Sequence, residues 1–249
     1  MPMLTGRVAI VTGSARNIGR ATALMLAREG AAVMVHARSD ADGLAETVAQ
    51  IAAAGAKAES YLADLSTEDG ANGLVEATVA KLGGVDILVN NAAVRRNTPI
   101  TEMSLAEWRE VLGASLDASF LTTRAAVPHM MAGKWGRIVN LGGISMFSGL
   151  AGRAHVSAAK AGMIGMTRSL ATELGPHGIT INVVAPGAIA TERGAAAGAR
   201  PAGTISSGVP VGRDGRTEEI AHIVTMLCSP DAAYTTGQTI EVNGGRHYS

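Results

Sequence analysis

A glycine-containing turn, Thr12 to Gly19 (TGSARNIG), has the residue types suited to holding a phosphate. Gly13 and Gly19 lack a Cβ, so the backbone there can bend sharply and approach a ligand closely, and Asn17 is a residue that tolerates the left-handed region. A helix that begins at such a turn presents free backbone N–H groups and the positive end of its dipole. We therefore predict that the turn cradles the pyrophosphate of a dinucleotide. The alternative is an ordinary strand-to-helix connection, because a glycine-rich turn alone is weak evidence.

Two arginines lie where a dinucleotide places the ribose of its adenine half. Segment 31–40 is predicted to be a buried strand, and it ends in His36, Ala37 and Arg38. An acidic residue at this point would bind the ribose 2′-hydroxyl, whereas an arginine suits a 2′-phosphate. Here the acidic residue is absent, and Arg38 together with Arg16 of the turn supplies two guanidinium groups. This pattern predicts NADP(H) rather than NAD(H), unless both arginines are merely solvated surface charges.

The elements that position these residues alternate between buried strands and helices, which indicates successive βαβ units. The expected strands are 8–11, 31–40, 57–63, 85–94, 136–143, 178–191 and 238–245. The first expected helix directly follows the turn at 12–19. The others cover 40–54, the segment after Ser66, 104 to about 131, 153–174 and 217–227. We predict one domain over residues 1–249: a Rossmann-like, doubly wound, parallel seven-stranded sheet with helices on both faces. Its ligand site should lie beyond the carboxyl ends of the strands.

Two helix starts carry capping signals. Ser66 is placed to cap the helix that follows it, and Ser104 with Glu107 three residues later has the form of a capping box. Segment 190–208 is rich in Gly and Ala and contains almost no large apolar residue, so we expect a mobile substrate flap there.

The composition excludes several classes of partner. Of 249 residues, 47% are hydrophobic, and 21 basic residues balance 21 acidic ones without a long run of either sign, which argues against nucleic acid or an anionic membrane as the main partner. No apolar stretch approaches the roughly 20 residues that span a bilayer. The single Cys228 cannot form an internal disulfide and the N-terminus lacks a signal-peptide profile, so a cytoplasmic location is expected. The histidines show no metal-ligand spacing, and no metal site is predicted.

Along essentially the whole chain these motifs resemble the classical short-chain dehydrogenase/reductase family, and most closely its 3-oxoacyl-carrier-protein reductases. TGSARNIG resembles the TGxxxGxG turn of that family, with Asn17 in place of the middle glycine, and NNAA at 90–93 resembles its NNAG segment. PGAIAT at 186–191 and VNGG at 242–245 match further family segments. Asp64 matches the acidic residue near the adenine ring.

The resemblance, with the two arginines, implies a set of NADP(H)-binding residues drawn from the turn and from the ends of successive strands. They are Gly13, Ser14, Ala15, Arg16, Asn17, Ile18, Gly19, Ala37, Arg38, Asp64, Leu65, Asn91, Ala92, Ala93, Lys160, Pro186, Gly187, Ile189 and Thr191. The resemblance also implies a homotetramer or homodimer and a small-molecule substrate.

The same resemblance singles out four catalytic positions, because the family's chemistry rests on Asn, Ser, Tyr and Lys. AAKAG at 158–162 places the Lys at Lys160, and the other three positions fall on Ser115, Gly143 and Val156. A valine can neither exchange a proton nor donate a hydrogen bond, and a glycine offers no hydroxyl. The family's usual acid/base group is therefore missing.

Other residues are candidates to replace it. His155 lies beside Val156 in the sequence and titrates in the useful range, although adjacent residues on a helix point about 100° apart. Ser145 follows the fifth strand and could supply a hydroxyl, and Lys160 could donate a proton if burial lowers its pKa, although binding the ribose is its expected role. We therefore take Lys160, His155 and Ser145 as the candidate catalytic residues, with Tyr248 of a neighbouring subunit as a further candidate.

Three functions fit this pattern. The first is an atypical NADP(H)-dependent oxidoreductase that reduces a C=O, C=N or activated C=C group. The second is a catalytically silent NADP(H)-binding protein or partner subunit, and the third is a non-redox enzyme that reuses the pocket. Arg95 and Arg96 near the entrance would favour an anionic substrate, unless they are solvated surface residues. Met146, Phe147 and Leu150 could line an apolar wall, or pack against the sheet or a neighbouring subunit.

Overall fold

The computed structural model describes residues 2–191 and 208–248, and it confirms the predicted sheet. Seven strands lie in the order β3-β2-β1-β4-β5-β6-β7, and every neighbouring pair is parallel. The strands are β1 Val8–Val11, β2 Ala32–Ala37, β3 Ala58–Leu62, β4 Ile87–Asn90, β5 Gly136–Leu141, β6 Ile179–Pro186 and β7 Thr239–Val242. The order reverses between β1 and β4, so the carboxyl ends of these two strands flank the crevice at which such sheets bind ligands.

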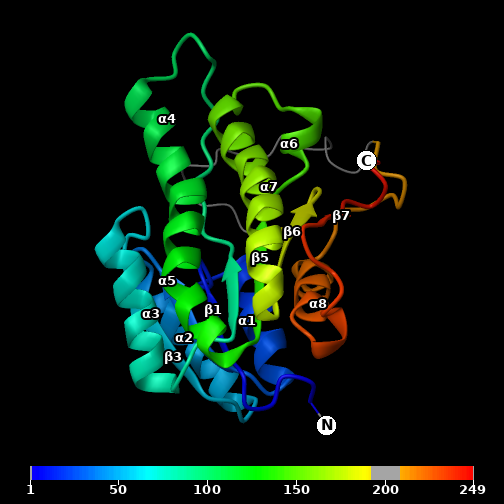
Figure 1. Cartoon of the computed structure of the whole chain (residues 1–249). Coiled ribbons are helices and arrows are strands. Elements are labelled where there is room, and N and C mark those ends of the chain that lie inside the picture. The colour runs from blue at the N-terminus through cyan, green and yellow to red at the C-terminus, as the bar shows by residue number, and fades with distance from the viewer. Residues whose placement is uncertain (1, 192–207, 249) are drawn as a thin grey trace.

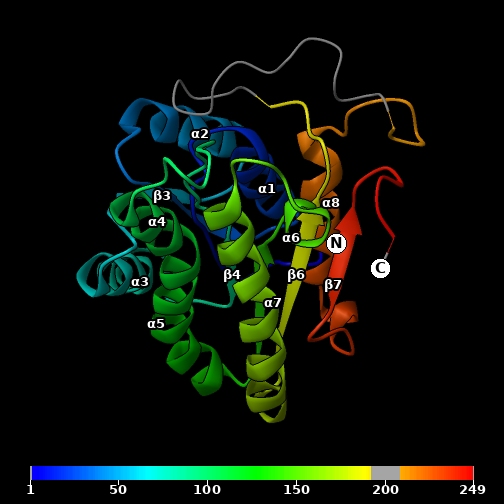
Figure 2. The same cartoon turned by 90° about the horizontal axis from the view of Figure 1, so that it is seen from above.

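Helices cover both faces of the sheet (Figures 1 and 2). Helices α1 (Asn17–Arg28), α2 (Ala41–Ala53) and α8 (Thr217–Leu227) lie on one face. On the other face lie α3 (Glu68–Leu82), α4 (Leu105–Leu112), α5 (Ala118–Gly133) and α7 (Ala154–Leu174). Within the described ranges no helix is both long and apolar enough to cross a membrane.

The two layers bury two separate hydrophobic cores, which β1 illustrates. Ala9 and Val11 belong to the core beneath α1, α2 and α8, whereas Ile10 belongs to the core beneath α3, α5 and α7. Successive side chains of a strand point to opposite faces, so a strand buried on both faces needs apolar residues at every position. The continuous apolar run VAIV satisfies this requirement and places the end of β1 in the centre of the molecule.

The cap predicted before α3 was wrong by one residue. Thr67, not Ser66, caps this helix, and its Oγ1 accepts from the N–H of Gly70 at 3.1 Å. Ser66 instead donates from both its N–H and its hydroxyl to Asp64 Oδ1, at 2.9 and 2.7 Å. Because an aspartate readily hydrogen-bonds two residues ahead of itself, the serine is used in a local turn and the helix begins later.

The long helix expected from 104 to about 131 consists of α4, a π-helical turn over Gly113–Asp117, and α5. Ser104 caps α4 as predicted, accepting from the N–H of Glu107 at 3.1 Å. The Glu107 carboxylate accepts from Thr98 Oγ1 and lies 3.2 Å from His155 Nε2, so it serves tertiary contacts.

The segment after β5 contains a short helix, α6 (Ser145–Ser148), where the sequence predicted only a loop. It lies close to the C-terminal tail (Figure 1). Residues 192–207, most of the predicted flap 190–208, lie outside the described residues.

Candidate active site

The turn after β1 has the tight geometry that its glycines predict. Gly13 adopts φ +63° and Asn17 adopts φ +53°, both in the left-handed region. A Cβ placed on Gly19 would lie 2.2 Å from the carbonyl oxygen of Gly13. No side chain fits in that space, so the first turn of α1 packs directly against the backbone of residues 13 and 14.

Asn91, which follows β4, fastens this turn to the next strand of the sheet. Its amide nitrogen donates to the carbonyl oxygens of Thr12 and Gly13 at 2.9 and 2.8 Å. In return, the Thr12 hydroxyl accepts from the backbone N–H groups of Asn91 and Ala92 at 2.9 and 3.0 Å. These four hydrogen bonds fix the ends of β1 and β4 against each other where the strand order reverses.

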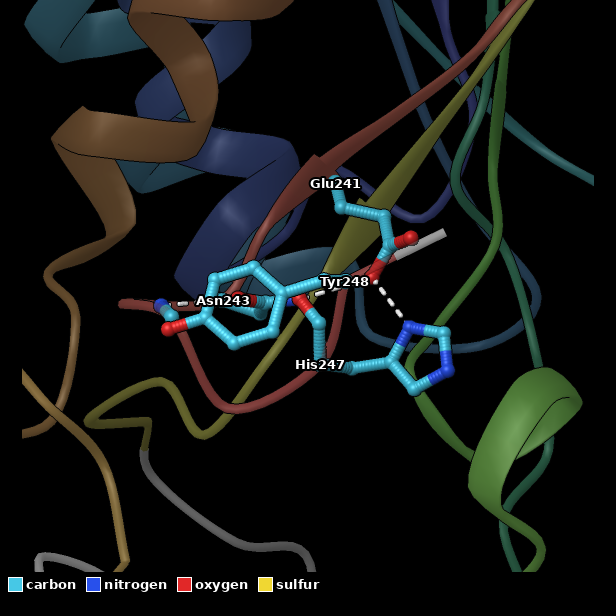
Figure 3. Close-up of a pocket in the computed structure, with 5 residues that line it drawn as sticks. Glu241, Asn243, His247 and Tyr248 are labelled. Carbon is cyan, nitrogen blue, oxygen red and sulfur yellow. Dashed lines mark hydrogen bonds and ion pairs between the residues drawn. The ribbon is translucent and has the colours of Figure 1, made fainter.

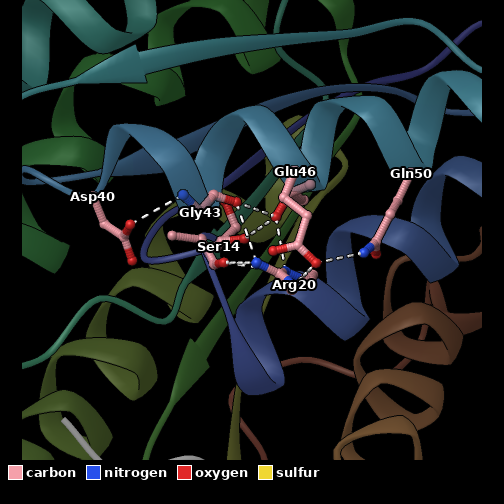
Figure 4. Close-up of polar contacts among 8 residues, drawn as sticks. Ser14, Arg20, Asp40, Gly43, Glu46 and Gln50 are labelled. Atoms are coloured by element: carbon pink, nitrogen blue, oxygen red, sulfur yellow. Dashed lines mark hydrogen bonds and ion pairs between the residues drawn. The ribbon is translucent and has the colours of Figure 1, made fainter.

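Arg20, a residue of α1, links the same turn to α2 (Figure 4). Its guanidinium donates to the carbonyl oxygen of Ala15 and to Thr47 Oγ1, and it forms an ion pair with Glu46 at 2.7 Å. Thr47 Oγ1 lies 3.1 Å from the carbonyl oxygen of Ser14. In a trans peptide the C=O and the N–H point in opposite directions. Because the carbonyls of Ser14 and Ala15 point toward α2, the N–H groups that follow them point away from it.

The start of α1 differs from the starts of α2, α3 and α4 in the way that anion binding requires. Side chains cap α2, α3 and α4 through Asp40, Thr67 and Ser104, whereas at α1 the N-cap residue Arg16 makes no capping hydrogen bond and the first turn has no acidic residue. An uncapped helix start leaves donors and dipole for a ligand. Residues 13–19 therefore fit a pyrophosphate.

His36 braces the turn from β2. The N–H of Gly13 donates to His36 Nδ1 at 3.3 Å, and Nε2 lies 3.0 Å from the carbonyl oxygen of Ala63. Nδ1 accepts and Nε2 must donate, so the ring is neutral with its proton on Nε2. Burial lowers the pKa of His36 from 6.5 to about 4.

The adenine end of the predicted site carries both arginines on the surface. Arg16 and Arg38 are exposed, and Ala37 between strand and loop is buried. Asp64 is also exposed, and hydrogen bonds from Ser66 hold the pKa of its carboxyl below the usual value, with a smaller contribution from the charge of Arg38. Leu65 is buried beside it. The predicted residues from β2 and β3 therefore meet at one edge of the sheet.

The predicted nicotinamide end lies where β6 approaches the segment after β7. A Cβ on Gly187 would lie 2.7 Å from Asn243 Cα, and the N–H of Gly187 donates to the carbonyl oxygen of Val242 at 2.9 Å. Pro186 ends β6, and the buried Ile189 pairs with Gly215 in a parallel bridge. The remaining predicted contact residues lie at the same carboxyl edge of the sheet. They are Ala92 and Ala93, which follow β4, and Thr191.

Lys160 is the one charged residue among the four positions that the family resemblance singles out. It lies in α7, is 4% exposed, and donates from Nζ to the carbonyl oxygen of Leu141 at the end of β5. Burial, with a smaller contribution from the charge of Arg95, lowers the pKa of Lys160 from 10.5 to about 7. Near neutral pH its amine can therefore both give and take a proton.

The other three of these positions carry no acid or base. Val156 is 6% exposed, and a Cβ on Gly143 would meet no atom of the described residues within 4 Å, so among them open space lies where a serine hydroxyl would project. Ser115 is buried within the π-helical turn, and its carbonyl oxygen accepts from Ser119 Oγ at 2.7 Å. A π-helical turn inside a longer helix often marks a functional position.

Two further sequence candidates, His155 and Ser145, make hydrogen bonds within the protein. His155 is fully buried, its Nε2 faces Glu107, and its Nδ1 accepts from the N–H of Val156 at 3.0 Å. Both ring nitrogens thus have partners within the protein. Ser145 is half-buried at the start of α6, and its carbonyl oxygen accepts from Ser157 Oγ at 3.1 Å.

A second polar cluster, of which the sequence patterns singled out only Tyr248, lies at the end of β7 and in the tail that follows it (Figure 3). Glu241, Asn243, His247 and Tyr248, with Gly245, line a cavity of about 350 Å³. The only local signal is that Glu241 and Asn243 stand two residues apart, and so lie on the same side of an extended chain. No group of three or more potential metal ligands occurs among residues 2–191 and 208–248.

Comparisons with known proteins place these features in a family. Residues 13–247 match the family model described as enoyl-(acyl carrier protein) reductase. A 3-oxoacyl-[acyl-carrier-protein] reductase of Synechocystis is 41% identical over 246 residues, covering 98% of both chains. The BbsD subunit of (2S)-[(R)-hydroxy(phenyl)methyl]succinyl-CoA dehydrogenase from Thauera aromatica is 39% identical, covering 98% of this chain and 97% of the relative. A solved structure of a Sinorhizobium meliloti protein, assigned as a short-chain alcohol dehydrogenase, has a TM-score of 0.90 at 35% identity over 98% and 97% of the two chains.

The buried His36 predicts a specific loss of stability in acid. Its pKa is about 4 in the folded protein and 6.5 when unfolded, so between these values only the unfolded chain takes up the proton. The contribution of His36 to the free energy of unfolding should therefore be fully present above pH 6.5, and the free energy should fall by up to about 3 kcal/mol toward pH 4. Urea unfolding at pH 7, 5.5 and 4.5 measures this for wild type, His36→Asn and the exposed-site control His222→Asn. A His36→Asn variant with the same pH dependence as wild type would contradict the expectation.

Proposed function

Because the chain belongs to the short-chain dehydrogenase/reductase family of oxidoreductases, we propose that it is an NADP(H)-dependent member with non-standard acid/base residues. In this proposal it reduces a C=O, C=N or activated C=C group of a small molecule. When bound, the reduced nicotinamide supplies the hydride. The names of its relatives, which include a ketone-reducing carrier-protein reductase, support a carbonyl or related unsaturated group as the substrate.

One contrast carries the proposal: the dinucleotide cradle is complete while the acid/base positions are altered. Asn91, Arg20 and His36 hold the turn in place. A glycine-rich turn that served only as a connection would not need such bracing. By contrast, Val156 cannot move a proton, so the chemistry needs either another acid or a substrate that accepts hydride without one.

Within this proposal each residue of the chain has a role. Residues 13–19 bind the pyrophosphate through backbone N–H groups, and Arg16 and Arg38 bind the 2′-phosphate. Lys160 binds the nicotinamide ribose and can exchange a proton near neutral pH. The space beside Gly143 admits a substrate group larger than a site with a serine would accept.

A catalytically silent NADP(H)-binding protein is the second candidate, and the altered residues themselves favour it. Val156, Gly143 and Ser115 together remove three groups that could orient or protonate a carbonyl. Such a protein would bind the dinucleotide without turnover and act as a partner subunit. In either case we propose a homotetramer or homodimer, supported by the exposed Phe120 and Met131 on α5, and a cytoplasmic location, supported by the single buried Cys228.

A substrate panel separates the two candidates. The purified protein is mixed with NADPH and a series of ketones, imines and activated alkenes, and NADPH oxidation is followed by absorbance. Turnover with at least one class is the expected result. Tight NADPH binding by calorimetry without turnover on any class would overturn the enzymatic proposal in favour of the silent one. Failure to bind either nicotinamide dinucleotide would overturn both and favour a non-redox enzyme.

The two exposed arginines predict the choice of dinucleotide. Arg38→Ala should weaken NADPH binding by one to two orders of magnitude and leave NADH binding nearly unchanged, because only NADPH carries the 2′-phosphate that the guanidinium pairs with. Calorimetric titration of both dinucleotides measures this, with the exposed surface variant Arg168→Ala as the matched control. Equal losses for NADPH and NADH would show that Arg38 does not read the 2′-phosphate.

A further inference from the structure

Two contacts orient the ring of His247 and a third holds its backbone; Figure 3 shows the contact with Glu241. Its Nδ1 lies 2.9 Å from Glu241 Oε2, and its backbone carbonyl oxygen accepts from the Asn243 amide at 3.0 Å. Its ring stacks on Phe147, with the centroids 5.0 Å apart and the planes inclined by 10°. A ring fixed in this way is pre-organised for proton transfer, because no rotamer search precedes the step.

The Glu241 carboxylate sets the protonation pattern of this imidazole. Oε2 also accepts from the Asn243 amide at 2.7 Å, and Oε1 is buried with no hydrogen-bond partner among residues 2–191 and 208–248. A carboxylate can only accept from Nδ1, so the proton of the neutral ring sits on Nδ1 and Nε2 is left to exchange protons. A carboxylate placed on Nδ1 also stabilises the imidazolium, as in hydrolytic triads. The Glu241–His247 pair is therefore built as a general acid/base.

The pair lies at the edge of the sheet where the substrate is expected. Asn243 directly follows β7, and a Cβ placed on Gly187, which follows β6, would lie 2.7 Å from Asn243 Cα. Phe147, on which the imidazole stacks, belongs to α6, and this helix begins two residues after Gly143. The N–H of Ile144 donates to the carbonyl oxygen of Pro186 at 3.0 Å, which joins the start of α6 to the end of β6. The histidine and the open space at Gly143 therefore belong to the same carboxyl edge.

We propose that His247, oriented by Glu241, is the acid that replaces the missing tyrosine in reduction of a carbonyl or imine group; this rests on the proposed function. The imidazolium gives its Nε2 proton to the substrate oxygen or nitrogen, directly or through water, as that atom receives the electron pair of the breaking double bond. The hydride that adds to the substrate carbon comes from reduced nicotinamide, which is oxidised. Water then reprotonates the imidazole.

Few other groups compete for this role. The cavity residues that can titrate are Glu241, His247 and Tyr248 among the described residues, and α6 contributes only Ser, Met and Phe side chains. Tyr248 is 80% exposed, whereas the His247 side chain is 27% exposed and so combines a fixed ring with access to ligand. His155, by comparison, has both ring nitrogens engaged.

An NMR measurement that needs no turnover tests the Glu241–His247 pair first. Long-range ¹H–¹⁵N NMR of histidine-labelled protein should show His247 protonated at Nδ1, and Glu241→Gln should change its tautomer or its titration. His222, on the exposed surface of α8, serves as the internal reference. A wild-type His247 without a proton on Nδ1 would overturn the proposed orientation.

Kinetics then test the role in proton transfer on a substrate from the panel. His247→Ala should lower kcat on the order of 10²-fold, lose the alkaline limb of the wild-type pH profile, and regain activity with added imidazole. NADPH affinity should stay unchanged, and the control His222→Ala should match wild type. A His247→Ala variant with wild-type kcat and pH profile overturns this inference, whereas wild-type protein without turnover overturns the proposed function instead. If kcat falls, but imidazole does not restore it and the pH profile does not change, His247 has only a structural role and the inference is overturned.

Discussion

The close backbone contact between the turn after β1 and the first turn of α1 is the constraint on which the site depends. Gly13 and Gly19 approach so closely that any Cβ on Gly19 would overlap a carbonyl oxygen. Asn91 then bonds two carbonyls of the same turn and ties it to β4. The carbonyls of Ser14 and Ala15 are drawn toward α2, so the two N–H groups that follow them point away from it, and α1 begins without a side-chain cap. The anion binding that we propose for this turn would follow from backbone geometry rather than from charged side chains.

This constraint separates the two halves of the site. The proposed dinucleotide half is built from backbone and from residues buried in the sheet, so it tolerates little change. The acid/base half consists of single side chains projecting from α7, α6 and the tail, and each can change without loss of the fold. Val156 and Gly143 sit in an otherwise intact framework, and the neutral or charged state of Lys160 is set by its burial. A pocket of this kind can keep its hydride chemistry while it changes its proton donor or its substrate.

Much of this architecture is predictable from sequence because it depends on local residue types. Apolar runs indicate the buried strands, and the glycine pattern indicates the tight turn after β1. The helix start after Asp64 was missed because Ser66 and Thr67 are equally good caps, and the choice between them depends on a side-chain contact with Asp64. Contacts between distant segments were not predictable. Glu107 and His155 are 48 residues apart, and His247 meets Phe147 only because the tail folds back toward α6.

The central claim is that hydride leaves a dinucleotide held at this turn although position 156 is a valine. Reaction of the protein with NADPH carrying deuterium at the transferable C4 position, followed by mass spectrometry of the product, tests it most directly. We expect one deuterium in the product, bonded to the carbon of the former double bond, and loss of the label from the oxidised dinucleotide. Product that forms without deuterium, with the label retained on the dinucleotide, would contradict the assignment of this protein as a hydride-transferring enzyme.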